Sequence, residues 1–468
     1  MINFQRGQPK KCVSLLLILA FILPHFFAGV TVSSAAPPEV KVGISLLHSY
    51  VELSFDSGYC LINMAEGSPL PLAEGRYRLV AINGNIQVQD RQGNNRGLFS
   101  GPLYLKPLSS QPAEQFFQLH NARSGLEYRG TLEIFLEGNS LKAVNILDLE
   151  SYLRGVLPRE ISSSWGNYGG MEALKAQAVA SRTYTLYYQS RPRHPRFQLC
   201  DMKHCQQYGG KSCETENTDR ALRETRGEIL TYNGVPISAY YHASNGGFTE
   251  VPQNVWTGSY PYYDSVADPY DDPNNPLGLS NFVKHRYADW KKDVPLHSVG
   301  ALLAGSGFKS PGTVEQVDIA AVSPSGRVQE LYIRGAGGNT VSLLKEESRN
   351  VFDLASLLYT IRSEAEPRVW IASCANGVES KACFPELEGK WALSGHTRKR
   401  MLIGETFFVL GEGVKNAVPY ASLIFEGHGS GHGVGLSQNG AYNRSRAGQE
   451  YKEILSFYYP GTVIETNY

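Results

Sequence analysis

The chain has 468 residues, a formal net charge of zero at pH 7, and an ordinary globular composition with 42% hydrophobic and 19% charged residues. This composition excludes an intrinsically disordered chain. The balanced charge, without a basic stripe, argues against a nucleic-acid-binding protein. The length exceeds what one hydrophobic core usually holds, so we expect more than one compact lobe.

Residues 1–36 have the three parts of a secretory signal peptide. A basic start is followed by an apolar run over 13–29 and by small residues suitable for cleavage before Pro37. We therefore expect export to the periplasm, cell envelope or medium, with an uncleaved membrane anchor as the alternative. Outside the cytoplasm cysteines can form disulfides, and we expect Cys374 and Cys383 to pair because they lie close together in a loop-like stretch.

The first half of the remaining chain changes from strand to helix signals. Residues 37–128 alternate short apolar runs with turns, which predicts a β-rich N-terminal region. Residues 149–154 predict a short helix that stops before Pro158. The stretch 171–190 is rich in alanine and lacks glycine and proline, so it predicts the most prominent helix of the chain.

The second half returns mainly to strand signals. Asn233-Gly234 between two apolar runs predicts a hairpin, and 313–347 predicts further strands. Residues 366–392 resemble an inserted loop, and 451–457 predict a short helix. The predicted fold class is α+β, with the β-rich N-terminal region followed by a mixed α+β region that contains the alanine-rich helix.

Glu160 is the candidate acid/base. It lies between a proline turn and the alanine-rich helix, next to Ile161 and close to Trp165. Burial by such neighbours would raise the pKa of the carboxyl group and keep it protonated near neutral pH. A protonated carboxyl can donate to the leaving oxygen of a glycosidic bond. From these residues alone, a surface glutamate or a helix cap is the alternative.

Candidate substrate contacts come from three segments. The alanine-rich helix carries polar side chains on one face, the segment 240–250 places hydroxyl and amide groups beside aromatic rings, and the segment 427–441 is unusually rich in glycine. Sugars present hydroxyl groups and C–H faces, so such mixtures suit a glycan. The alternatives are an ordinary strand end and a glycine hinge. The expected contacts are Lys175, Arg182, Tyr241, Ser244, His432 and Gln438.

A third feature is the set His194, Cys200, His204 and Cys205. Two thiolates and two imidazoles make a complete tetrahedral set for zinc. Because four protein ligands leave no open position, such a zinc would be structural. Two alternatives remain open: a disulfide between Cys200 and Cys205, or a pairing of one of them with Cys213.

Four blocks follow one another along the chain: Tyr152 to Val156 with Pro158 and Glu160, Glu172 to Tyr184, Ser244 to Glu250 with Trp256, and Gly431 to Ala441. These blocks resemble the SpoIID/LytB proteins of bacteria. The similarity runs from about Arg129 to the C-terminus, which gives a predicted catalytic region over 129–468. The resemblance implies an exported lytic transglycosylase that cleaves glycan strands between N-acetylmuramic acid and N-acetylglucosamine. It places the essential glutamate at Glu160, and it implies a zinc site in some members at the segment 194–205.

A lytic mechanism needs a single acid/base carboxyl, whereas a hydrolase of the usual kind needs two. Glu250 and Asp268 are the candidates for a second carboxyl. The resemblance also implies a non-enzymatic alternative, in which the protein binds glycan and enhances a cell-wall amidase as its partner. A zinc hydrolase is disfavoured because the chain lacks an open-site ligand set such as H-E-x-x-H.

Overall fold

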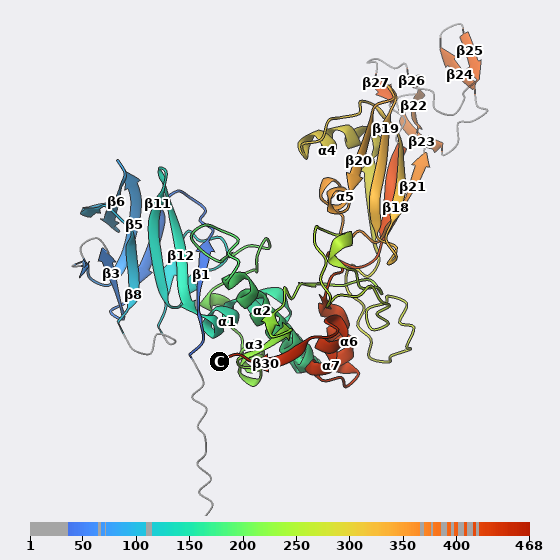
Figure 1. Cartoon of the computed structure of the whole chain (residues 1–468). Coiled ribbons are helices and arrows are strands. Elements are labelled where there is room, and N and C mark those ends of the chain that lie inside the picture. Colours follow the sequence, from blue (N-terminus) through green and yellow to red (C-terminus); the bar gives the residue numbers. More distant parts are fainter. Residues whose placement is uncertain are drawn as a thin grey trace, which may run out of the picture. The chain divides into compact units, whose positions relative to one another are not determined.

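The computed structural model describes residues 36–63, 67–70, 72–108, 115–365, 369–375, 378–384, 391–394, 397–400, 407–409, 415–417 and 421–468 (Figure 1). The predicted signal segment therefore lies almost wholly outside the described residues. Residues Pro37–Asn467 form one compact unit. Among the described helices, none has the length and apolar character needed to cross a membrane.

The N-terminal part is built from two β-sheets, which confirms the predicted β-rich region. One sheet has the strand order β13-β1-β12-β11-β8-β3-β4 and the other β10-β9-β2-β5-β6-β7. Side chains alternate between buried and partly exposed along strands such as β2 and β3, as expected for sheets with one face on a core. The strands are β1 Glu39–Ile44, β2 Val51–Phe55, β3 Tyr59–Asn63, β4 Ser68–Pro69, β5 Gly75–Ile82, β6 Asn85–Asp90, β7 Asn95–Phe99, β8 Leu103–Pro107, β9 Phe117–Leu119, β10 Glu127–Tyr128, β11 Thr131–Glu137 and β12 Ser140–Asp148.

The boundary predicted at residue 129 lies between β10, a strand of the second sheet, and β11, a strand of the first. Strand β12 pairs with β1 on one side and with β11 on the other, and Figure 1 shows the three side by side. Strand β13 (Leu199–Cys200) comes from the metal-ligand segment and pairs in parallel with β1. The N-terminal sheet therefore extends to Asp148 and also holds one end of the predicted zinc site.

Helix α1 runs from Leu149 to Glu160, so the prediction that it stops before Pro158 was wrong. Asp148 caps its start by accepting a hydrogen bond from the Ser151 N–H at 3.0 Å. Pro158 lacks the N–H that would bond to the Arg154 carbonyl, and the helix continues for only two residues beyond it. Glu160 is consequently the last residue of a helix rather than part of a turn.

Helix α2, Met171–Gln189, is the longest described helix and confirms the alanine-rich prediction. Helices α6 and α7 and strand β14 pack against it. The predicted hairpin is also present, because β14 pairs with β15 and both turn residues, Asn233 and Gly234, have positive φ. The remaining elements around α2 are η1 Ser163–Tyr168, η2 Lys211–Cys213, α3 Glu216–Glu224, β14 Glu228–Tyr232, β15 Val235–Pro236, β16 Tyr241–His242, η3 Pro252–Asn254, β29 Leu436–Ser437, α6 Gln438–Arg446, α7 Tyr451–Tyr458 and β30 Val463–Thr466.

Residues 290–427 form a further group of strands, which we call the 290–427 subdomain. It has its own hydrophobic cluster, in which Leu331, Phe352 and Phe425 are fully buried. Its principal sheets have the orders β17-β28-β21 and β18-β19-β20. The elements are β17 Trp290–Pro295, η4 Leu296–Ser298, α4 Val299–Gly305, β18 Val314–Val322, β19 Val328–Gly335, β20 Thr340–Leu344, α5 Glu346–Val351, β21 Tyr359–Ala365 and β28 Ala421–Gly427.

The segment 366–392, predicted as an inserted loop, contains paired strands. β22 (Val369–Ala375) and β23 (Val378–Phe384) form an antiparallel ladder. Two further antiparallel pairs follow, β24 (Trp391–Ser394) with β25 (Thr397–Arg400) and β26 (Phe407–Val409) with β27 (Lys415–Ala417). The predicted pairing of Cys374 with Cys383 concerns side chains outside those that the structure describes, so it stays a prediction.

Candidate functional site

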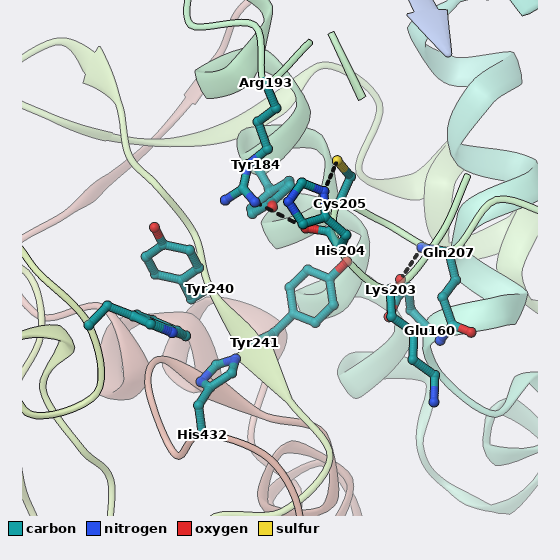
Figure 2. Close-up of a pocket in the computed structure, with 11 residues that line it drawn as sticks. Glu160, Tyr184, Arg193, Lys203, His204, Cys205, Gln207, Tyr240, Tyr241 and His432 are labelled. Atoms are coloured by element: carbon teal, nitrogen blue, oxygen red, sulfur yellow. Dashed lines mark hydrogen bonds between the residues drawn. The ribbon is translucent and has the colours of Figure 1, made fainter. Parts of the chain in front are cut away.

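A cavity of about 460 Å³ opens where helix α1 ends, between the Cys200–Gln207 segment and the glycine-rich block (Figure 2). Its lining combines one carboxyl group, two basic side chains, four tyrosine or tryptophan side chains, two imidazoles, one thiol and one amide. These residues are Glu160, Tyr184, Arg193, Lys203, His204, Cys205, Gln207, Tyr240, Tyr241, Trp256 and His432.

Glu160 enters this cavity from the last position of α1. Its side chain is partly exposed, and its Oε1 accepts a hydrogen bond from the Gln207 N–H at 2.7 Å. Burial raises the pKa of Glu160 to about 7, against the opposing effect of hydrogen bonds from Gln207 and Tyr241. A carboxyl group with this pKa exchanges protons readily at neutral pH, which suits a group that must act first as acid and then as base.

Glu160 is the only residue with a carboxyl group among the described residues that line the cavity. Both candidates for a second carboxyl are fully buried elsewhere. Glu250 accepts hydrogen bonds from the Ser323 and Ser325 hydroxyls at 2.6 and 2.7 Å. Asp268 forms an ion pair with Arg444 at 2.9 Å. The described cavity therefore lacks the second carboxyl that a two-carboxylate hydrolase would use.

Tyr241 and His432 are the two predicted substrate contacts that do line the cavity. The His432 Nδ1 accepts a hydrogen bond from the Val434 N–H at 3.1 Å. Burial, with the nearby charges of Arg349 and Arg327, lowers the pKa of His432 to about 3. The imidazole is therefore neutral at physiological pH, and it can shape the cavity but cannot serve there as a general acid.

Arg182 and Lys175 were predicted as substrate contacts, and the structure places neither in the cavity. The Arg182 side chain is fully buried and holds Glu150 through Nε and Nη2 at 2.8 and 3.0 Å. Lys175 forms ion pairs with Glu172 and Glu224, both at 2.8 Å. The face of α2 that carries them packs against other elements, since helices cover this part of α2. The sequence periodicity alone could not reveal that covering.

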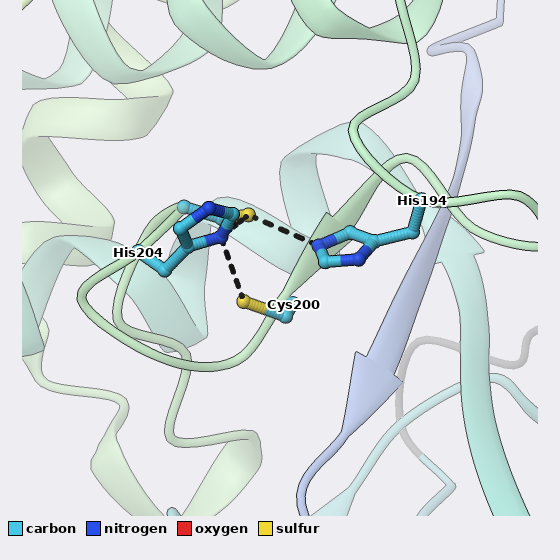
Figure 3. A group of neighbouring side chains, drawn as sticks. His194, Cys200 and His204 are labelled. Atoms are coloured by element: carbon cyan, nitrogen blue, oxygen red, sulfur yellow. Dashed lines mark hydrogen bonds between the residues drawn. The ribbon is translucent and has the colours of Figure 1, made fainter. Parts of the chain in front are cut away.

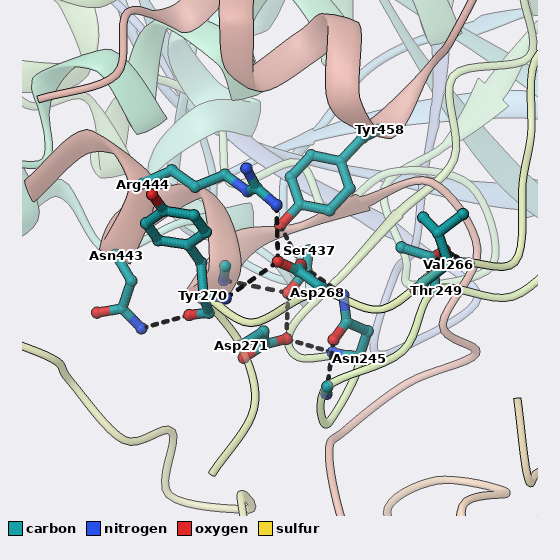
Figure 4. A network of polar contacts seen from close by, with 12 residues as sticks. Asn245, Thr249, Val266, Asp268, Tyr270, Asp271, Ser437, Asn443, Arg444 and Tyr458 are labelled. Atoms are coloured by element: carbon teal, nitrogen blue, oxygen red, sulfur yellow. Dashed lines mark hydrogen bonds and ion pairs between the residues drawn. The ribbon is translucent and has the colours of Figure 1, made fainter. Parts of the chain in front are cut away.

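Ser244 and Gln438 are also buried outside the cavity lining, and Ser244 bonds to Asp271 of the polar network that Figure 4 shows. The Ser244 hydroxyl donates to Asp271 at 3.0 Å, and Gln438 donates to Gln177 at 3.3 Å. Asp271 also accepts from the Ser437 hydroxyl at 2.6 Å. Asp271 therefore links the segment 240–250 to the glycine-rich block, and Gln438 links α6 to α2. The structure shows both predicted contacts holding protein segments together, not lining the cavity.

Arg193, Lys203, Tyr184, Tyr240 and Trp256 line the cavity although they were not among the predicted site residues. The Arg193 guanidinium lies 4.2 Å from the Tyr188 ring centroid, and its Nη1 donates to the His204 carbonyl at 3.0 Å. The available sequence signal was position: Arg193 directly precedes the predicted metal-ligand segment 194–205, and Lys203 lies within it. The signal for Trp256 was its place in the third family block.

The predicted zinc ligands converge (Figure 3). One donor atom from each of His194, Cys200, His204 and Cys205 lies within 4.8 Å of every other. Cys205 Sγ is 3.5 Å from His194 Nε2 and 3.3 Å from His204 Nδ1. Ligand atoms bound at about 2.0 to 2.3 Å in a tetrahedron are separated by similar distances. Both cysteines are free thiols in the structure. The donor set fits zinc.

Comparisons with known proteins agree with these features. Residues 137–232, which hold Glu160, α2 and the cysteine-histidine cluster, match the SpoIID family, described as stage II sporulation protein. The chain is 31% identical over 321 residues to the amidase enhancer of Bacillus subtilis (strain 168), covering 67% of this chain but only 40% of that protein. It is 30% identical over 343 residues to an uncharacterized protein of Brachyspira hyodysenteriae (strain ATCC 49526 / WA1), covering 73% of each chain.

A further relative is the stage II sporulation protein D of Bacillus subtilis (strain 168), with 24% identity over 338 residues and 76% of that protein covered. The mixed α+β fold and these relatives together define a protein whose function is related to the cell wall. The chain belongs to the SpoIID/LytB family.

Proposed function

We propose that this protein is an exported lytic transglycosylase that cleaves peptidoglycan glycan strands between N-acetylmuramic acid and N-acetylglucosamine. The observation that carries the proposal is Glu160, which is the only carboxyl among the described cavity residues and has a pKa raised to about 7. One carboxyl is enough if the substrate supplies its own nucleophile. The family membership supports the cell wall as the place of action, in the periplasm or at the cell envelope.

In the proposed reaction Glu160 acts twice. Protonated Glu160 donates to the oxygen that leaves C1 of the muramyl residue, and the glycosidic C1–O bond breaks. The carboxylate then takes the proton of the C6 hydroxyl on the same sugar as that oxygen bonds to C1. Glu160 ends protonated, the product carries a 1,6-anhydro ring, and no water is consumed. Throughout, the Gln207 N–H holds the carboxyl oxygen in place at 2.7 Å.

A zinc ion held by His194, Cys200, His204 and Cys205 would be structural, since four protein ligands leave no open position. Its contribution would be to close the segment 194–205 against β1, with which Cys200 pairs. Gln207 follows this segment by two residues and bonds to Glu160. The four zinc-binding residues would therefore fix the position of the Gln207 N–H, which orients the Glu160 carboxyl.

Replacing Cys205 with serine is expected to remove about one equivalent of bound zinc and to lower the melting temperature, because metal binding to such a site contributes to folding. Elemental analysis and thermal unfolding measure the two effects. Cys213 is a free thiol outside the cluster, so Cys213→Ser is the matched control and should retain the metal. Equal zinc content and melting temperature in wild type and Cys205→Ser would contradict the assignment.

The alternative function is a non-catalytic glycan-binding enhancer of a cell-wall amidase. The name of the amidase enhancer relative favours it, although this chain spans about two fifths of that protein's length. In this case the cavity binds glycan, an amidase is the partner, and Glu160 is a ligand contact rather than an acid.

Mass spectrometry of the products from purified glycan strands separates these functions. The wild-type protein should release fragments ending in 1,6-anhydro-N-acetylmuramic acid. Fragments with ordinary reducing ends would instead mean hydrolysis. A hydrolase of the usual kind needs a second carboxyl group to activate water, and the described cavity lining has only Glu160. Binding of glycan without any cleavage would favour the enhancer.

A further inference from the structure

Trp256 forms part of the cavity wall, and its indole meets two other rings. The centroid of its ring lies 4.8 Å from that of His432 and 4.9 Å from that of Tyr240. It remains partly exposed within the cavity lining. An aromatic ring that is fixed by neighbouring rings and still partly exposed in a cavity suits the C–H face of a sugar ring.

The segment 250–256, which carries Trp256, is held by residues of the 290–427 subdomain. Lys345, just after β20, donates through Nζ to the backbone carbonyls of Gln253 and Trp256 at 2.7 and 3.0 Å. At the start of the segment, Glu250 accepts hydrogen bonds from Ser323 and Ser325 of the same subdomain. The position of Trp256 therefore depends on side chains that lie roughly 70 to 90 residues later in the chain.

Lys345 has a backbone conformation that disfavours any residue except glycine. Its φ is 51° and its ψ is −125°. This region is open to glycine, and residues with a Cβ occupy it at a cost of about 1–3 kcal/mol. A tight turn alone would be satisfied better by glycine. A lysine at this position therefore needs a reason other than the turn itself. The structure shows one, because the lysine side chain makes two hydrogen bonds to the segment that carries Trp256.

We propose that Trp256 is a stacking platform for a sugar ring of the bound glycan and that Lys345 is the positioning residue that holds this platform. The proposal rests on the proposed function to the extent that the ligand is a glycan strand. It does not require cleavage, because an enhancer that only binds glycan would use the same platform.

The test is Lys345→Gly, which relieves the unfavourable backbone conformation and removes the two hydrogen bonds to the segment that carries Trp256. The melting temperature is expected to stay equal or rise, whereas the dissociation constant for purified glycan strands is expected to rise about tenfold, the usual effect of losing charged hydrogen bonds that orient a contact. Lys345→Arg, which keeps a cationic donor, should restore part of the affinity. In a Trp256→Ala background, Lys345→Gly should have no further effect, because a positioning residue acts only through what it positions.

Asp353→Gly is the matched control. Asp353 lies in the same subdomain, also has a positive φ of 47°, and has a side chain that is 98% exposed. Its replacement should leave glycan affinity unchanged. The Lys345 proposal is overturned if Lys345→Gly binds glycan as wild type does, or if it weakens binding equally with and without Trp256. A wild-type protein that binds no glycan would overturn the platform together with the proposed function, whereas one that binds without cleaving would overturn only the lytic activity.

Discussion

Replacing Glu160 with glutamine is expected to reduce the rate of glycan cleavage by about a thousandfold, the typical contribution of a positioned acid/base group. Glutamine has nearly the same shape, and its carbonyl oxygen can still accept the hydrogen bond from the Gln207 N–H. The amide group of glutamine cannot protonate the leaving oxygen, and it cannot take the proton of the C6 hydroxyl afterwards. Glycan affinity should therefore stay within a few fold of wild type while anhydro-ended products disappear. A variant that cleaves at the wild-type rate would exclude Glu160 as the acid/base.

The pKa of Glu160 also gives the activity a defined pH dependence. Since the first step needs the protonated carboxyl and the folded-state pKa is about 7, kcat/KM should fall tenfold for each pH unit above that value. The rate remaining in Glu160→Gln should lack this decline. A wild-type profile that stays flat between pH 6 and 9 would indicate that another group supplies the proton.

The same pKa makes a prediction about stability. The pKa of Glu160 is raised from 4.5 to about 7, so its contribution to the free energy of unfolding is fully present below pH 4.5 and is lost as the pH rises through 7. Glu160→Gln should therefore unfold like wild type at pH 4 and be more stable at pH 8, by up to about 3 kcal/mol. Glu224 gives a control of opposite sign, because ion pairs with Lys175 and Arg220 lower its pKa to about 2.

The second large effect is expected at the buried pair of Arg182 and Glu150. Replacing Arg182 with methionine should destabilise the protein by about 3–5 kcal/mol, because Glu150 would lose its bidentate charged partner in a buried site. Replacing both residues with methionine should recover much of that loss, since a buried carboxylate no longer has to be accommodated. Urea unfolding monitored by circular dichroism measures both changes.

Lys175→Met is the companion variant, because Lys175 was also predicted to contact the substrate. Its ion pairs lie nearer the surface, and such pairs contribute about 0–1 kcal/mol. We expect a nearly unchanged unfolding free energy and an unchanged glycan affinity. A Lys175 variant with normal stability and weakened glycan binding would show that this face of α2 does reach the ligand, contrary to the contacts in the structure.

Features that depend on short stretches of chain could be predicted from the sequence. The alanine-rich stretch specifies α2, and Asn233-Gly234 specifies a hairpin, because helix propensity and turn conformation are properties of a few neighbouring residues. The ordered family blocks indicated Glu160, and the set of two histidines and two cysteines within 194–205 indicated the candidate metal ligands. The structure places Glu160 in the cavity and brings the four donors together.

Tertiary contacts decided the rest. Whether Arg182 meets a ligand or Glu150 depends on what covers its side of α2. The elements that its guanidinium contacts are α1, α3 and β14. The sequence likewise could not show that Lys345 reaches Trp256 across 89 residues. Local sequence therefore determined which chemical groups this protein carries. Only the packing of distant segments determined which of those groups face the cavity, because burial and hydrogen-bond partners are set by neighbours in space rather than in sequence.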